Sequence, residues 1–101
     1  MQFVWDPDKA AANIERHDGV SFDEAVEAFY DEYAIEEFDD THSTIAEKRF
    51  LRIGLSTKRL LVVVFVDLTI DQVGFPVYRI ISARRAARHE QKLYEEFNQK
   101  E

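Results

Sequence analysis

Apolar side chains recur in the first third of the chain with the period of a helix. In residues 22–29 they occupy the i, i+3, i+4 and i+7 positions of an amphipathic helix, directly after a capping box from Ser21 to Glu24. An earlier helix is predicted from Pro7 to about His17, because an Asp-Pro pair is a typical helix start and a glycine follows the last periodic residue. Two short helices are therefore expected before residue 30.

Strands are predicted where apolar residues alternate with polar ones or run continuously. Residues 60–66 form an uninterrupted apolar and β-branched run, which is typical of the buried centre of a sheet. Further strands are predicted at residues 2–5, 33–38, 49–54 and 75–81, with a longer connection at 67–74. The order is β-α-α-β-β-β-β-α, and short connections between successive strands predict an antiparallel sheet packed by helices. We expect an α+β fold of one domain, residues 1–101.

A last helix is predicted directly after strand 75–81, with Ser82 as its N-cap. This boundary places Arg84 and Arg85 in the first helical turn, where the helix dipole prefers anions. On such a helix a cationic stripe would form from Arg84, Arg85, Arg88 and Lys92. Arg79, near the end of the strand, can point to the same edge. The pattern predicts a phosphate-binding cluster at the junction of strand and helix. For any single arginine a solvated position, or pairing with the chain's own acids, is the more ordinary explanation, and the prediction depends on the cluster as a whole.

Composition narrows the possible chemistry. The chain has no cysteine, which excludes disulfides, a thiol nucleophile and cysteine-ligated metals. The three histidines lie far apart, and Asp39 and Asp40 lack a further ligand at a recognised spacing, so we expect no metal. No glycine-rich phosphate loop is present, and no cofactor is expected. Without a long apolar run or a basic, apolar leader, the sequence predicts a cytoplasmic protein with no membrane segment.

Charge is distributed unevenly along the chain. The net charge is −7, but residues 1–47 contain 2 Lys+Arg and 14 Asp+Glu, a balance of −12. Residues 48–101 contain 11 Lys+Arg and 6 Asp+Glu, a balance of +5, and the charges of the two halves sum to −7. Such asymmetry indicates one sector that faces a basic partner and another that faces phosphate.

Three segments resemble the BrnT toxins of bacterial type II toxin–antitoxin systems. They are F-V-W-D-P-D-K-A-A-A-N-I-E-R-H-D-G-V-S-F-D-E-A at 3–25, D-x-x-H-S-x-x-x-E-x-R at 39–49 and R-I-I-S-A-R-R-A-x-x-x-E-x-x-x-Y at 79–94. The resemblance implies a RelE-like ribonuclease that cuts RNA and arrests growth. It also implies neutralisation by a BrnA-type antitoxin with a ribbon-helix-helix domain, through which alone the complex contacts and represses its operator DNA.

Metal-independent RNA cleavage needs a base, a stabiliser for the phosphorane and an acid for the departing 5′-oxygen. Arg79, Arg84 and Arg49 are the candidates for charge stabilisation, because a guanidinium binds phosphate oxygens in pairs. Glu47, the carboxylate of the E-x-R segment, is the candidate base, or it forms a simple salt bridge with Arg49. The candidates for RNA contact are Arg85, Arg88, Lys92, His42 and Lys9.

Two alternatives to an enzyme remain open from the sequence. The chain could be a non-catalytic module that only binds an antitoxin within a repressor complex, a role that its acidic N-terminal half would suit. It could also be a structural domain in which the arginines neutralise the chain's own carboxylates. His42 in its polar loop and Lys9, three residues after Asp6, have equally ordinary explanations as an exposed side chain and a local ion pair.

Overall fold

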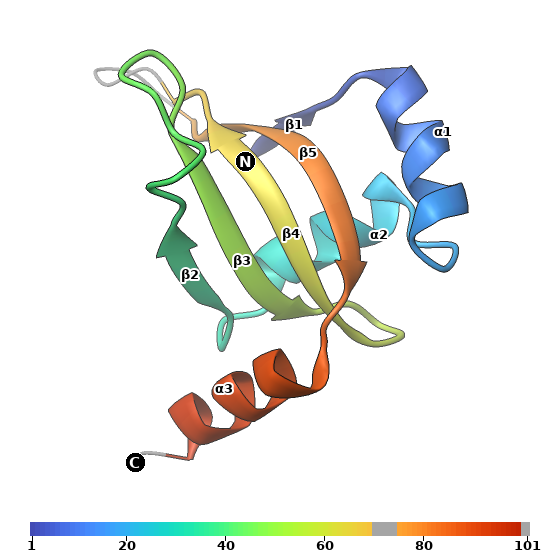
Figure 1. Ribbon diagram of the computed structural model, residues 1–101, viewed down its shortest axis with the longest axis vertical. Coiled ribbons are helices and arrows are strands. Elements are labelled where there is room, and N and C mark those ends of the chain that lie inside the picture. Colours follow the sequence, from blue (N-terminus) through green and yellow to red (C-terminus); the bar gives the residue numbers. More distant parts are fainter. Residues whose placement is uncertain (70–74, 100–101) are drawn as a thin grey trace.

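The computed structural model describes residues 1–69 and 75–99, in which five strands form one sheet (Figure 1). The strands are β1 (Gln2–Val4), β2 (Ile35–Phe38), β3 (Arg49–Leu55), β4 (Leu60–Asp67) and β5 (Val77–Arg85). The helices are α1 (Pro7–Arg16), α2 (Phe22–Glu27) with a 3-10 turn η1 (Ala28–Tyr30), and α3 (Arg88–Asn98). The α+β class is confirmed. Most of the predicted connection 67–74 lies outside the described residues.

The sheet is mixed, and the prediction of a purely antiparallel sheet is wrong for β1. Its strand order is β1-β5-β4-β3-β2, with antiparallel pairs from β2 through β5. β1 instead runs parallel to β5, with Gln2 opposite Val77. Short connections force neighbouring strands to be antiparallel, but β1 is followed by two helices and lies at the opposite edge from β2. No short connection therefore fixes its direction.

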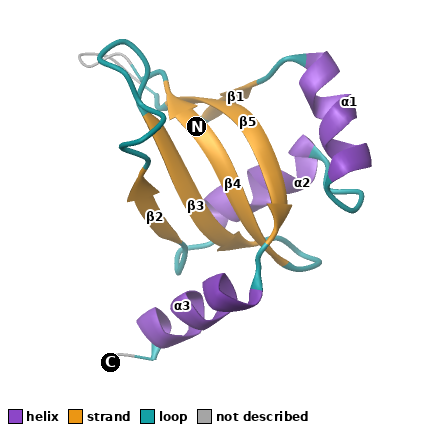
Figure 2. Ribbon diagram, viewed as in Figure 1, coloured by secondary structure: helices purple, strands orange, loops and turns teal. Residues whose placement is uncertain are grey.

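Helices α1 and α2 supply the apolar cover for one face of the sheet. Figure 2 shows α2 crossing behind the sheet, while α1 lies beside β5. The side chains of this core come from both layers: Val20, Phe22, Ala25, Ala28, Phe29, Leu61, Val63, Phe65, Ile80 and Ala83. The Phe29 ring packs between Phe65 and Tyr78, with centroid distances of 4.9 and 5.3 Å. Burial of this cluster is the main stabilisation of the fold.

The last strand is longer than predicted, and the last helix starts later. Ser82 lies inside β5 opposite Val64, so it is not an N-cap. The N-cap of α3 is Ala87, whose N–H donates to the Glu90 carboxylate at 2.7 Å. The apolar run of β4 offers pairing partners for the four residues Ser82 to Arg85, and this pairing outweighs the local capping signal. The predicted cationic stripe on one helix therefore does not form.

Helix α3 lies at the end of the sheet and is attached by polar contacts. It has no buried residue. The Arg84 guanidinium donates two hydrogen bonds of 2.7 Å to the Glu90 carboxylate. The Tyr94 hydroxyl donates to Asp31 Oδ2 at 2.7 Å, and the Asn98 amide donates to a backbone carbonyl before β2. Specific polar anchors, rather than apolar burial, hold this helix to the body.

The Tyr94 anchor predicts an alkaline loss of stability. Burial, together with the hydrogen bond to Asp31 and its negative charge, raises the pKa of Tyr94 to about 12. Because the folded pKa exceeds the unfolded value of about 10, the stabilisation is complete below pH 10 and is lost as pH rises through 12. Urea unfolding of wild type should show this loss, and Tyr94→Phe should show less of it. Equal pH slopes for the two proteins would contradict the prediction.

Candidate active site

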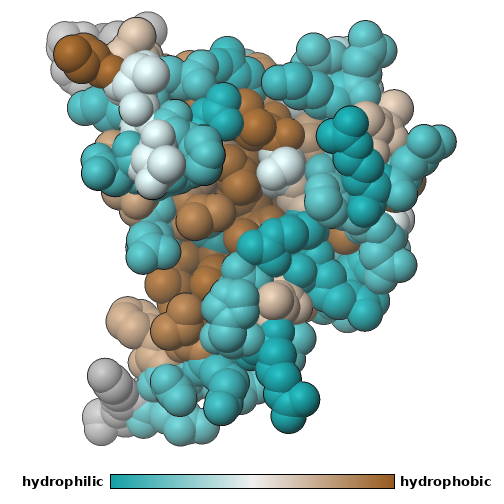
Figure 3. Space-filling view, in the orientation of Figure 1, coloured by the Kyte–Doolittle hydropathy of each residue, from teal (hydrophilic) through white to brown (hydrophobic). Residues whose placement is uncertain are grey.

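The sheet face turned away from α2 is the open face of the molecule. Strand register and alternation place on it Arg49, Leu51, Ile53, Val62, Val64, Val66, Arg79, Ser82 and Arg84. Figure 3, in the orientation of Figure 1, shows this face as a hydrophobic centre framed by hydrophilic side chains. The charged side chains of the open face therefore lie at its margins.

One margin carries a carboxylate between two arginines, which we call the Glu47 cluster (Glu47, Arg49 and Arg79). Arg49 of β3 and Arg79 of β5 lie opposite the same residue of β4, Val66, so they flank it on one face. Arg49 Nη2 lies 3.2 Å from Glu47 Oε1, and Arg79 Nη2 lies 2.9 Å from Glu47 Oε2. The Glu47 side chain is 36% exposed. Two cations and one anion leave the cluster with a net positive charge that is accessible to an anion.

The loop before β3 is fixed to Arg49 by its backbone. The Arg49 N–H donates to Ser43 Oγ at 2.8 Å, and the Asp39 N–H donates to the Arg49 carbonyl at 2.8 Å. The Glu47 N–H donates to Thr44 Oγ1 at 3.0 Å. These contacts place Glu47 and the beginning of β3 in one rigid unit, against which β5 brings Arg79.

The same loop holds a histidine oriented by a carboxylate. His42 Nδ1 lies 2.9 Å from Asp39 Oδ2, and the His42 side chain is 67% exposed. Partial burial raises the pKa of Asp39, but hydrogen bonds from the His42 backbone and ring outweigh this effect and hold the pKa below its usual value. The contact with Asp39 uses Nδ1 only, and the ring is otherwise largely exposed. Sequence reasoning set Asp39 aside as a metal ligand and noted the D-x-x-H spacing only as part of a resemblance, so it missed this pairing, which that spacing could have indicated.

The structure does not bring Arg84 to the Glu47 cluster. Five residues of extended chain separate Arg84 from Arg79, a distance of roughly 16 Å. The Arg84 guanidinium instead binds Glu90, and these hydrogen bonds raise the pKa of Arg84 and lower that of Glu90. Arg84 thus anchors α3 at the far end of the open face.

Comparison with protein families gives one match. The family described as "Ribonuclease toxin, BrnT, of type II toxin-antitoxin system" matches residues 5–90. The chain belongs to the BrnT family. Comparison with curated proteins finds no match. The matched range contains the whole Glu47 cluster and the Asp39–His42 pair, but it ends at Glu90 and leaves most of α3 outside.

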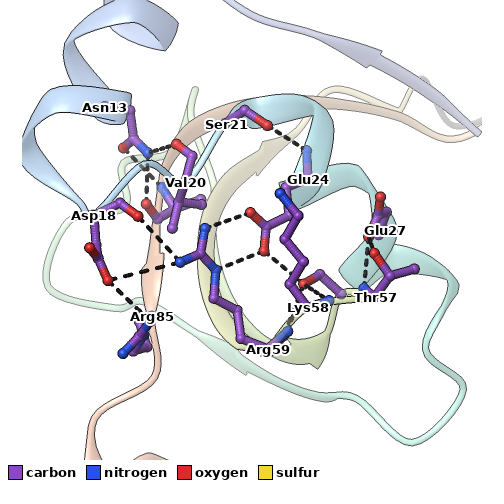
Figure 4. A network of polar contacts seen from close by, with 12 residues as sticks. Asn13, Asp18, Val20, Ser21, Glu24, Glu27, Thr57, Lys58, Arg59 and Arg85 are labelled. Atoms are coloured by element: carbon purple, nitrogen blue, oxygen red, sulfur yellow. Dashed lines mark hydrogen bonds and ion pairs between the residues drawn. The ribbon is translucent and has the colours of Figure 1, made fainter.

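Arg85, proposed from sequence as an RNA contact, belongs to a polar network on another side of this BrnT-family fold (Figure 4). Arg85 Nη2 lies 3.1 Å from Asp18 Oδ2, and the carbonyl of the same aspartate accepts from Arg59. At the centre of the network Arg59 donates to both oxygens of Glu24, at 2.8 and 2.9 Å. The network ties the α1–α2 loop to the β3–β4 turn. Its geometry indicates a structural role.

The remaining predicted RNA contacts are dispersed. Lys9, on α1, lines a cavity of about 470 Å³ between α1 and β5, together with Arg16, His17 and Ser82. Arg88 and Lys92 are exposed on α3. The structure therefore brings Glu47, Arg49 and Arg79 together, places His42 on the adjoining loop, and leaves the other candidates apart.

In residues 1–69 and 75–99, no group of three His, Asp or Glu side chains is placed to hold a metal ion. None of the described helices has the length and apolar character needed to cross a membrane.

Proposed function

We propose that this BrnT-family protein is a metal-independent endoribonuclease with a RelE-like fold, and that its site is the Glu47 cluster. The observation that supports this most strongly is the pair of guanidinium groups at one margin of the open face, with a carboxylate between them. A phosphodiester carries one negative charge and two non-bridging oxygens. Two guanidinium groups can bind both oxygens and stabilise the additional charge of the phosphorane.

In the proposed reaction the 2′-hydroxyl of RNA attacks the adjacent phosphorus. Arg49 and Arg79 bind the non-bridging oxygens and exchange their contact with Glu47 for contact with phosphate. The freed Glu47 carboxylate accepts the proton of the 2′-hydroxyl. His42, oriented by Asp39, donates a proton to the 5′-oxygen as its bond to phosphorus breaks. The products are a 2′,3′-cyclic phosphate and a free 5′-hydroxyl, so no water or metal enters the bond-breaking step.

A toxin of a type II system has an antitoxin partner, and we propose that this partner is a BrnA-type protein with a ribbon-helix-helix domain. DNA contact and repression of the operon would then come through the antitoxin alone. The acidic balance of this chain supports that division, because a net charge of −7 does not favour direct binding to DNA. The activity is expected in the cytoplasm, where its RNA substrate is found.

The direct test is cleavage of end-labelled single-stranded RNA by the purified protein in excess EDTA. We expect fragments that end in 2′,3′-cyclic phosphate, with the same yield in the presence and absence of EDTA. Cleavage that stops in EDTA and returns with Mg²⁺ would contradict a metal-independent mechanism. If the folded protein cleaves neither free RNA nor ribosome-bound RNA, the ribonuclease proposal fails.

A second candidate function is a non-catalytic module that binds the antitoxin. It is favoured by the ion pairs within the cluster, in which Glu47 already contacts both arginines. The two functions differ in what a substitution at Arg79 changes. An enzyme loses RNA cleavage while still binding its partner, whereas a docking module has no cleavage to lose and can change only in its affinity for the partner.

A further inference from the structure

A groove lies between α3 and the open face of the sheet, at the opposite end from the Glu47 cluster. It has a volume of about 610 Å³, which is within the usual range for binding pockets. Its floor consists of Ile35, Leu51, Ile53 and Val62 from three neighbouring strands. The hydrophobic centre seen in Figure 3 continues toward this end of the face. A groove of this volume with an apolar floor favours a ligand with apolar side chains.

The wall of the groove is an apolar helix face without a partner. Leu93 and Phe97 of α3 line the groove, and they are 53% and 61% exposed. A surface helix normally buries such a stripe, yet α3 is held by polar anchors on its flanks and buries no residue. The helix is therefore positioned to leave these side chains facing the groove.

The rim of the groove is acidic. Four glutamates line it, of which Glu36 pairs with Arg52 and Glu90 pairs with Arg84. The other two, Glu37 and Glu96, have no ion-pair partner among the residues that the structure describes. Uncompensated carboxylates around an apolar floor match a segment that carries lysine or arginine beside its apolar residues.

We propose that this groove binds a basic amphipathic segment of the antitoxin, whose apolar side chains contact Leu93 and Phe97 and whose cations contact Glu37 and Glu96. Because the proposed function supplies the antitoxin as partner, the identity of the occupant rests on that function. The groove-facing residues of α3 beyond Glu90 lie outside residues 5–90, the part of this chain that the family model matches. They are suited to distinguish the cognate antitoxin from those of related systems.

The test compares two groove variants of the intact toxin with two control variants of matched chemistry. Phe97→Ser and Glu96→Lys alter the groove, whereas Ile14→Ser on α1 and Glu95→Lys on α3 alter exposed residues outside it. The probe is the antitoxin produced from the reading frame next to the toxin gene, with affinity measured by calorimetry. Each groove variant should weaken binding by about tenfold or more, and each control by less than about twofold. Circular dichroism checks that all variants fold.

Hydrogen exchange gives a second measurement of the same site. Antitoxin binding should protect amides of β2 and α3 in wild-type toxin. Wild-type affinity in both groove variants, no binding by wild type, or protection confined to other elements would overturn the proposal. So would a dimer of toxin alone that Phe97→Ser dissociates, because a second copy would then fill the groove. RNA cleavage by the same variants without antitoxin is measured separately, and its absence in all of them refutes the ribonuclease function without affecting the binding result.

Discussion

Replacement of Arg79 with alanine is expected to lower the rate of RNA cleavage by about 100-fold or more, the usual effect of removing one donor that stabilises a transition-state anion. Arg79 binds Glu47 from a different strand than Arg49, so its loss leaves one guanidinium where the proposed mechanism needs two. Its side chain is partly exposed and contributes little to the core. The cleavage rate is measured under single-turnover conditions with labelled RNA.

Two further variants show whether the effect depends on position and on guanidinium geometry. Lys58→Ala removes a cation from the β3–β4 turn, at the far end of these strands, and should leave the rate unchanged. Arg79→Lys keeps the charge but loses paired donation, and it should fall between wild type and alanine. An unchanged rate in folded Arg79→Ala would remove the Glu47 cluster from the mechanism.

Replacement of Glu24 with glutamine is expected to destabilise the protein by roughly 3–5 kcal/mol, the usual cost of breaking a buried ion pair. Glu24 is only 6% exposed, and it binds Arg59 through both oxygens and accepts a hydrogen bond from Ser56. The hydrogen bonds from Arg59 lower the pKa of Glu24, although burial opposes them. The variant leaves the Arg59 guanidinium without its carboxylate. Urea unfolding followed by circular dichroism measures the change.

The matched control is Glu15→Gln, an exposed position on α1, which should change stability by less than about 0.5 kcal/mol. The sign of the pH effect follows from the lowered pKa of Glu24. Its stabilisation is present above the unfolded pKa and is lost as pH falls through the folded pKa. A Glu24→Gln protein as stable as the control would show that the network in Figure 4 contributes little to the fold.

Local patterns were sufficient to predict most elements, but not the pairing between distant ones. The hydrogen bond that the Glu24 N–H donates to Ser21 Oγ and the apolar run of β4 were both predicted from short segments. The other half of the predicted capping box does not form, because the Glu24 carboxylate accepts from Arg59 and Ser56 instead. The end of β5 depends on β4, because strand pairing continues past a serine that alone would cap a helix. The direction of β1 likewise depends on a neighbour from the other end of the chain.

The same division applies to the candidate site. The contact between Glu47 and Arg49 was predicted on the condition that the strand begins at Glu47; β3 begins only at Arg49, yet the two side chains still meet because they are two residues apart. That Arg79 joins them depends on the register of three strands, which the sequence pattern alone does not define. Arg84 was grouped with Arg79 on the assumption of a helix at Ser82, and its position in a strand separates the two. The carboxylate partners of Arg84 and Arg85 could be found only from tertiary structure.

The position of β5 has a consequence for synthesis of the protein. The strand supplies Arg79, pairs with β1 and bonds through Ala83 to Asn13, a residue 70 positions earlier. A nascent chain that has not yet emerged beyond β5 has an unpaired β1, an unanchored α1 and only half of its cationic pair. Domains fold as their segments leave the ribosome, N-terminal parts first. While β5 is still inside the ribosome, the Glu47 cluster is therefore incomplete, and it forms only once β5 pairs with β4 and β1.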